Sequence, residues 1–262
     1  MPIALLAGRR VRYELGGTPS GPSLVFANSL GTDLSLWDPQ MPALEGRYRV
    51  LRFDARGHGQ SELGDLPCTI EVLGRDALSL LDALGLGRVH FCGLSIGGQM
   101  GQWLGAHAPE RLDRLVISNT AAHIGTAETW NARIAAVREH GTGVLMPGLL
   151  ERWFTAAFRE RAPAAVARAE AMVRATTAAG YTALCEAVRD SDATPYLGRI
   201  TAPTLVIAGA ADPVTTPADG RALAAAIAGA RYVELPAAHL ANVEAADAFT
   251  AALLAFLDGE GA

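Results

Sequence analysis

One serine lies in a segment whose residue types suit nucleophilic catalysis. Gly93-Leu94-Ser95-Ile96-Gly97 places small residues two positions before and after the serine. This spacing is typical of a nucleophile elbow, a sharp turn that needs small neighbours so that a strand and a helix can approach each other. An apolar run at 89–92 precedes it and a helical pattern at 96–107 follows, whereas an incidental serine in a glycine-rich turn would not need either. The turn would present Ser95 at a helix N-terminus, which favours developing negative charge.

A serine hydroxyl is a weak nucleophile until a base removes its proton, and that base is expected to be a histidine oriented by a carboxylate. Folds with this elbow carry the three groups in the chain order serine, acid, histidine. Asp212 comes just after an apolar run at 204–208, and His239 follows the short run 232–235. Both would lie at the carboxyl ends of strands, where open sheets bind ligands. We predict a triad of Ser95, Asp212 and His239, since His58 precedes Ser95 and has the wrong order.

Acyl transfer also needs hydrogen-bond donors for the oxyanion that forms on the attacked carbonyl. One donor is expected to be the backbone N–H of Ile96, which follows the nucleophile, and the other comes from the loop after the third strand. That loop reads Asn28-Ser29-Leu30-Gly31, so Leu30 N–H is the predicted second donor. Asn28-Ser29 stands where His-Gly is common in this fold, but a backbone donor tolerates that change.

The rest of the sequence predicts the sheet that would position these residues. Residues 9–15 alternate between polar and apolar, which is typical of a half-buried edge strand. Continuous apolar runs predict strands that are buried on both faces; they are 24–27, 50–53, 89–92, 115–117 and 204–208, with a last short strand at 232–235. Helical patterns alternate with them, including one that Thr69 caps and Gly85 ends. The fold class is therefore α/β, a mostly parallel sheet flanked by helices.

The alternation of strands and helices stops between residues 123 and 196. Only helical patterns occur there, at 129–140, 144–158, 163–178 and 181–189. A wholly helical insertion in an α/β sheet predicts a cap over the edge of the sheet. We therefore divide the chain into a core of residues 1–122 and 197–262 and an inserted helical cap of residues 123–196.

Composition and charge exclude several classes of partner. The chain of 262 residues is half hydrophobic, has a net charge of -5 and contains no run rich in Lys or Arg, which argues against nucleic acid. No segment approaches the roughly 18 apolar residues of a membrane span. The short apolar start is followed, not preceded, by Arg9 and Arg10, unlike a signal peptide. We expect a cytoplasmic protein with a small-molecule substrate, and the sequence leaves homo-oligomer formation open.

Cysteine and histidine spacing gives no sign of a metal site. Cys68, Cys92 and Cys185 are far apart and form no C-x-x-C pair, which is typical of reduced thiols in a cytosolic protein. The six histidines match no zinc-binding spacing such as H-E-x-x-H. We therefore expect neither a metal nor a cofactor.

Several motifs resemble those of a known enzyme family. Residues 54–61, Asp-Ala-Arg-Gly-His-Gly-Gln-Ser, resemble the D-x-R-G-x-G-x-S loop of α/β-hydrolases, which marks the fold and not the substrate. More specific are residues 28–33 with 37–40, residues 93–98 continuing to 108–111, and residues 119–125. Together these segments resemble the 3-oxoadipate enol-lactonases of the β-ketoadipate pathway, and the resemblance covers the whole chain.

The resemblance implies that the chain hydrolyses a small enol-lactone bearing a carboxylate to 3-oxoadipate, in aromatic catabolism, through an acyl-enzyme. Two alternatives use the same triad, a carboxylesterase and a hydrolase of carbon–carbon bonds. An alternative from another class is a hydrolase-fold receptor that binds a small molecule without useful turnover. Dehalogenase and epoxide-hydrolase chemistry are disfavoured because the elbow carries a serine and not an aspartate.

A substrate with a carboxylate needs a cation in the pocket, and the predicted cap offers Arg133. A helix that starts near Trp130 places Trp130, Ile134 and Val137 on one face, with Arg133 beside them. An arginine on an apolar face either snorkels or pairs with an anion. We predict that Arg133 and Trp130 bind substrate, with a salt bridge inside the cap as the alternative for Arg133. Trp153 would line the pocket or pack in the cap, and Trp37 is expected near the entrance.

Overall fold

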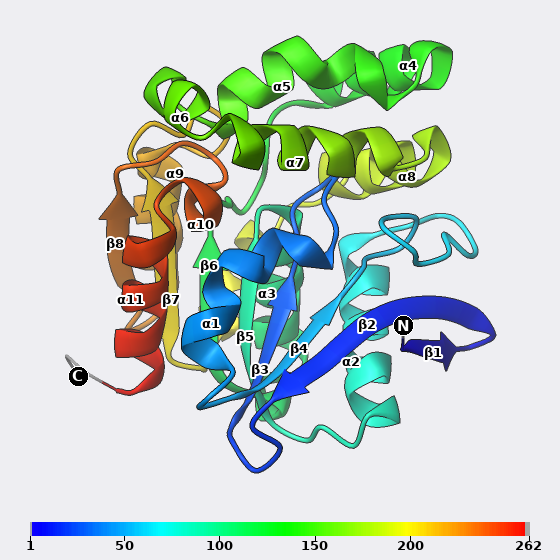
Figure 1. The fold of residues 1–262 in the computed structure, drawn as a ribbon. Coiled ribbons are helices and arrows are strands. Elements are labelled where there is room, and N and C mark those ends of the chain that lie inside the picture. The colour runs from blue at the N-terminus through cyan, green and yellow to red at the C-terminus, as the bar shows by residue number, and fades with distance from the viewer. Residues whose placement is uncertain (1, 260–262) are drawn as a thin grey trace.

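A twisted sheet of eight strands forms the centre of the molecule in the computed structural model, which describes residues 2–259 (Figure 1). The strand order is β1-β2-β4-β3-β5-β6-β7-β8. The parallel strands are β4, β3, β5, β6, β7 and β8, while β1 and β2 are antiparallel to their neighbours. The bounds are β1 (Ile3–Leu6), β2 (Arg9–Gly17), β3 (Ser23–Ala27), β4 (Arg49–Phe53), β5 (Val89–Leu94), β6 (Leu112–Ser118), β7 (Thr204–Gly209) and β8 (Arg231–Leu235).

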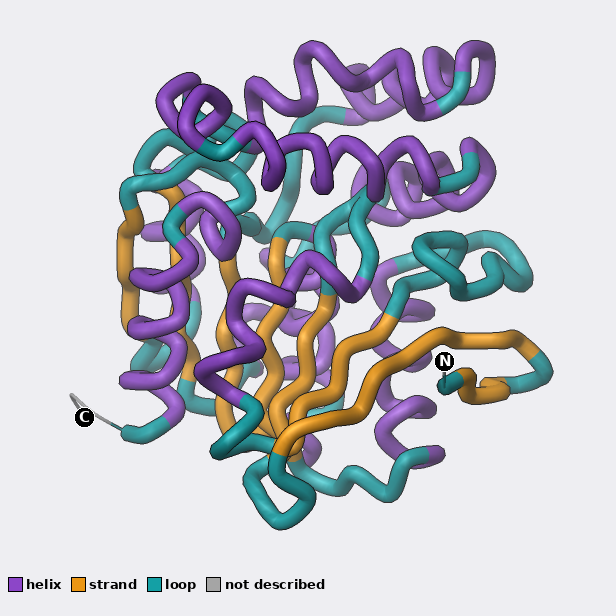
Figure 2. Tube along the Cα trace, in the orientation of Figure 1, coloured by secondary structure: helices purple, strands orange, loops and turns teal. Residues whose placement is uncertain are grey.

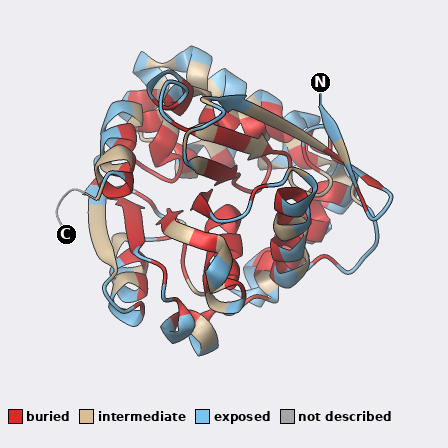
Figure 3. Cartoon of the chain, turned by 90° about the horizontal axis from the view of Figure 1, so that it is seen from below, coloured by how far each residue is buried: buried red, intermediate tan, exposed pale blue. Residues whose placement is uncertain are grey.

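The central strands are buried on both faces, as their apolar runs predict. Every residue of β5 and of β7 is buried, because helices cover the sheet on either side (Figure 3). On one face lie α1 (Met41–Leu44) and α11 (Ala246–Leu257), and on the other lie α2 (Ile70–Ala83), α3 (Ile96–His107) and α9 (Pro217–Ala226) (Figure 1). The predicted α/β class is confirmed.

The edge strand β1 is one element that the sequence analysis missed. It pairs with the start of β2 through a two-residue turn at Ala7 and Gly8, both of which have positive φ angles of 48° and 81°. Such a turn matches the twist of a hairpin. The run of apolar residues at the start of the chain is therefore half of a β-hairpin.

Helices of the predicted cap region lie over the carboxyl ends of the parallel strands (Figures 1 and 2). They are α4 (Ala127–His140), α5 (Met146–Trp153), α6 (Ala156–Arg161), α7 (Pro163–Ala175) and α8 (Ala178–Arg189). The single helix predicted at 144–158 is wrong, because Phe154 has extended φ and ψ angles of -137° and 141° and Thr155 caps a new helix. This break frees the backbone oxygen of Trp153, which accepts a hydrogen bond of 3.1 Å from Leu240 N–H.

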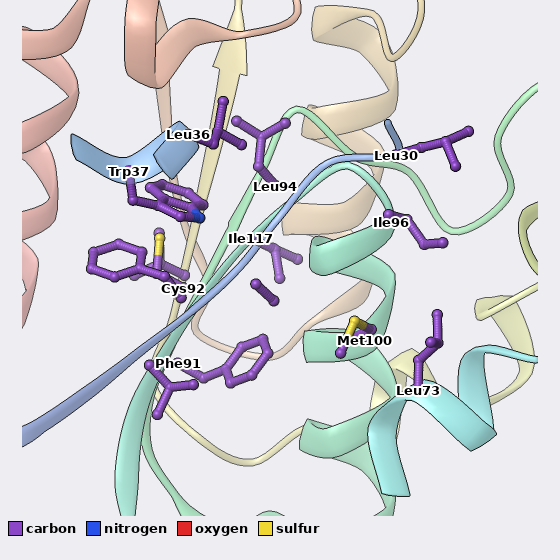
Figure 4. Packing of buried hydrophobic residues seen from close by; sticks show 14 of the residues in the cluster. Leu30, Leu36, Trp37, Leu73, Phe91, Cys92, Leu94, Ile96, Met100 and Ile117 are labelled. Atoms are coloured by element: carbon purple, nitrogen blue, oxygen red, sulfur yellow. The ribbon is translucent and has the colours of Figure 1, made fainter. Parts of the chain in front are cut away.

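Shorter helices complete the chain, namely η1 (Leu34–Gln40), η2 (Pro109–Arg111), η3 (Thr142–Leu145), η4 (Thr194–Arg199) and α10 (Ala241–Glu244). Trp37, in η1, is fully buried and stacks on Phe26 with ring centroids 4.4 Å apart. The expectation that Trp37 lies near the site entrance is therefore wrong, and Figure 4 shows it among core side chains. Of the helices within residues 2–259, none is both long and apolar enough to cross a membrane.

Candidate active site

Ser95 occupies a strained turn between β5 and α3. Its φ and ψ angles are 59° and -118°, in a region that side chains other than glycine rarely adopt. A Cβ atom on Gly93 would lie 2.1 Å from the Gly97 oxygen, and one on Gly97 would lie 2.3 Å from the Ala27 oxygen. Both glycines are therefore required for the strand, the turn and the helix to pack. Thr120 Oγ1 holds the turn by donating to the Ser95 oxygen at 2.8 Å.

The sheet brings the predicted acid and base together at this edge. His239 Nδ1 lies 2.8 Å from Asp212 Oδ2, and both side chains are almost fully buried. Asp212 follows β7, and His239 follows β8, the neighbouring strand. Ser95 and His239 line the same cavity. The arrangement can pass a proton from a serine hydroxyl to an imidazole that a carboxylate orients.

Asp212 is held by donors on both of its oxygens. Oδ1 accepts from the N–H groups of Val214 and Thr215 at 2.8 and 3.2 Å, and Oδ2 also accepts from Thr215 Oγ1 at 2.8 Å and Asn119 Nδ2 at 3.0 Å. Burial alone would raise the pKa of Asp212, but His239 and these hydrogen bonds outweigh it and lower the pKa to about 2. The group is therefore an anion at neutral pH that can stabilise an imidazolium.

The two predicted oxyanion donors lie on adjacent segments, Leu30 after β3 and Ile96 at the first position of α3 (Figure 4). The first N–H groups of a helix have no partner within the helix, so Ile96 N–H is available to a ligand. Leu30 lines the cavity with Ser95. Asn28 anchors the Leu30 loop, since its Nδ2 donates to Phe53 O at 2.8 Å and its Oδ1 accepts from Trp37 Nε1 at 2.9 Å.

The cap closes the cavity with two arginines. Arg133 of α4 and Arg152 of α5 both line it, and neither makes an ion pair with a carboxylate within the described part of the chain. The Arg152 Nε is buried, and no described residue gives it a hydrogen-bond partner. Burial and the nearby Arg133 lower the pKa of Arg152, so the two cations repel each other. This pair is suited to an anionic ligand, because a carboxylate would satisfy both charges.

Aromatic side chains surround the two arginines. The guanidinium of Arg133 lies 4.8 Å from the Trp130 ring centroid, and Trp130 Nε1 donates to the Ile124 oxygen at 2.6 Å. Trp153 also lines the cavity and is buried. Tyr181, fully buried, contacts both this cavity and the Leu30 loop, where a Cβ on Gly31 would lie 3.0 Å from its ring. The cavity therefore has a cationic end under the cap, and Ser95 lies at its floor.

Sequence reasoning missed Arg152, Tyr181 and Asn119. A signal for Arg152 was present, because it lies three residues after Leu149 and so shares the inward face of α5 with Leu149 and Trp153. Tyr181 carried no such signal, since its contact with the Leu30 loop joins segments far apart in the chain. Asn119 follows β6 and reaches Asp212 only through the neighbouring strand.

Metal-ligating side chains do not gather in the described residues, where no group of three or more histidine, cysteine or acidic residues could hold an ion. The cysteines Cys68, Cys92 and Cys185 are free and buried, and burial raises the pKa of each thiol. The polar side chains that line the cavity include those of Ser95, His239, Arg133 and Arg152.

Comparison with known proteins gives one consistent family. Residues 22–246 match the family described as the alpha/beta hydrolase fold. The chain is 42% identical to 3-oxoadipate enol-lactonase 2 of Acinetobacter baylyi and 38% identical to 3-oxoadipate enol-lactonase 1 of the same species; the alignments cover 94% and 92% of this chain and 92% and 91% of those proteins. The solved enol-lactonase from Burkholderia xenovorans superposes with a TM-score of 0.96 at 46% identity, covering 98% of this chain and 100% of that one.

Proposed function

The chain belongs to the α/β-hydrolase family and, within it, to the 3-oxoadipate enol-lactonases, and we propose that it opens its lactone through an acyl-enzyme on Ser95. It is a hydrolase of carboxylic esters. The observation that carries the proposal is a single cavity that joins Ser95 and His239 to two arginines, neither of which pairs with a carboxylate of residues 2–259. A nucleophile at one end and an anion site at the other suit a small lactone that bears a carboxylate.

The proposed reaction has two halves. Ser95 Oγ attacks the lactone carbonyl while His239 takes its proton, Asp212 holds the imidazole in orientation, and the N–H groups of Ile96 and Leu30 stabilise the oxyanion. The ring C–O bond then breaks, and the enol oxygen leaves with a proton from His239 and becomes a ketone by tautomerisation. Water, activated by His239, attacks the acyl-enzyme and releases the second carboxylate of 3-oxoadipate and the free serine.

We assign recognition of the substrate carboxylate to Arg133 and Arg152 together. Arg133 is already engaged, since its guanidinium lies over the Trp130 ring and beside Tyr181. Burial raises the pKa of Tyr181, and the nearby Arg133 only partly opposes that rise. The buried Nε of Arg152 has no hydrogen-bond partner in the part of the chain that the structure describes, so an anion would stabilise it more. Trp130 and Trp153 would pack against the apolar part of the lactone and exclude water.

The experiment that tests this function compares turnover of the enol-lactone with turnover of an uncharged ester such as p-nitrophenyl acetate. The proposal is supported if the enzyme prefers the carboxylated lactone and if the Ser95→Ala variant loses turnover of it. Turnover of the uncharged ester alone would point to a carboxylesterase, and binding of the lactone without turnover would point to a receptor. We further propose that the enzyme works in the cytoplasm, where its three buried, unpaired thiols would remain reduced.

A further inference from the structure

Asn119 lies at the carboxyl end of β6, between the nucleophile and the acid. It is 1% exposed and has a φ angle of 45°, one of three positive φ values among the described residues other than glycine. Its N–H donates to the Ile207 oxygen at 2.8 Å, so the backbone is still tied to β7 at this point. Asparagine tolerates the left-handed conformation better than most residues, and glycine adopts it without strain.

The side chain of Asn119 satisfies three polar partners. Nδ2 donates to Asp212 Oδ2 at 3.0 Å and to the Ala238 oxygen at 3.1 Å, while Oδ1 accepts from Ser118 Oγ at 2.7 Å. Only one orientation of the amide is compatible with these neighbours, because the flipped amide would point its oxygen at a carboxylate and a carbonyl. Asn119 thus joins the loop that carries the acid to the loop that carries the base.

We propose that Asn119 is a positioning residue that sets the alignment of Asp212 with His239. Its two N–H groups bind the carboxylate oxygen that accepts from His239 Nδ1 and the carbonyl of the residue before His239. One planar amide therefore fixes the separation of the two loops, and it also favours the ionised carboxylate. The inference rests on the proposed triad, but it is independent of which ester the enzyme cleaves.

The first test is Asn119→Gly, which removes the amide and keeps the backbone conformation unstrained. Loss of a hydrogen bond to a charged group should lower kcat by roughly 10- to 100-fold. KM should change little, because Asn119 does not line the cavity that holds the substrate. A loss of kcat of no more than about twofold relative to wild type would overturn the proposal.

The second test is Asn119→Asp, which keeps the shape of the side chain and makes its interaction with Asp212 depend on pH. Asp212 contacts this position directly, and His239 is the titratable group that pairs with Asp212. On the other side, Glu244 accepts from Ala238 N–H at 2.9 Å. Arg133 and Arg152 line the cavity with His239. At low pH the neutral acid can donate its O–H to Asp212 in place of Nδ2. At high pH its ionised form repels Asp212 and the Ala238 carbonyl. The ratio of variant to wild-type kcat should therefore fall as pH rises, and the ratio removes the titration that both proteins share.

A matched control separates this role from general loss of packing. Gln102→Ala also removes a buried amide, one that donates to the Ala121 oxygen in the segment after β6 at 3.3 Å. Within residues 2–259 Gln102 makes no hydrogen bond to Ser95, Asp212 or His239. Its kcat ratio to wild type should be independent of pH, whatever its loss of thermal stability. A flat ratio for Asn119→Asp, or failure of both Asn119 variants to fold at any pH, would make Asn119 a purely structural residue. Failure of the triad itself would instead appear as an active Ser95→Ala enzyme.

Discussion

Replacement of Arg152 by methionine tests the anion site most directly. Methionine keeps an apolar stem of similar length and removes the cation, so packing against the cap changes less than with alanine. Arg152 and Arg133 have no carboxylate partners in residues 2–259, so the substrate would supply the missing charge. A charge-assisted hydrogen bond of this kind contributes about 1.5–3 kcal/mol, which is roughly 10- to 150-fold in kcat/KM.

The two arginines should not contribute independently. Burial and, after it, the nearby Arg133 lower the pKa of Arg152, so removal of either cation relieves their repulsion. The double variant Arg133→Met, Arg152→Met should therefore lose a different factor from the product of the single losses. The assay is kcat/KM for the carboxylated enol-lactone and for p-nitrophenyl acetate, measured on each variant.

The uncharged ester serves as the internal reference, because the triad and the oxyanion donors are separate from the two arginines. Arg138→Met is the matched control, since Arg138 is also on α4 but pairs with Glu186 away from the cavity, at 2.6 Å. Equal losses on both substrates would show that Arg152 supports the cap and does not bind the anion. No loss on either substrate would refute the anion site altogether.

Three further predictions concern the triad and its environment. Ser95→Ala should fold normally and lose at least roughly 10³-fold in kcat, and activity within tenfold of wild type would exclude Ser95 as the nucleophile. Exhaustive chelation should leave activity intact, since the residues described by the structure include no metal-binding cluster; a loss that added zinc restores would contradict this. Because the folded pKa of Asp212 is lowered to about 2, its ionisation stabilises the protein above the unfolded value of 3.8, by about 2 kcal/mol, and this contribution is lost as pH falls through about 2. Urea unfolding at a series of pH values should show the difference between wild type and Asp212→Asn shrinking toward low pH, and a constant difference would disprove the assignment.

The sequence alone determined the elements that depend on local pattern. Runs such as 204–208 are almost wholly apolar because both faces of a central parallel strand are buried, so the sequence predicts buried strands there. The elbow at Ser95 was equally readable, since the close approach of Gly97 to the Ala27 oxygen leaves no room for a side chain. The order of Asp212 and His239 after successive strands predicted that they would meet at one edge of the sheet, where they lie 2.8 Å apart.

The tertiary structure decided the features that join segments far apart in the chain. Where the helix predicted at 144–158 breaks, Trp153 O and Thr155 bind the segment after β8, at Leu240 and Glu244. Trp37 is in the core because Asn28 and Phe26 hold it there. These outcomes depend on which polar groups meet in three dimensions.

The composition of the cavity likewise depends on contacts between segments far apart in the chain. Arg133 was found from a single helix, but its relation to Arg152 and to Tyr181 depends on how α4, α5 and α8 pack against one another. Asn119 binds Asp212 across 93 positions of sequence, and nothing in its neighbours along the chain indicates that contact. Periodicity reports which face of an element is buried, whereas the partner of a polar group is set by the packing of whole elements, because a hydrogen bond requires its two atoms to lie within about 3 Å.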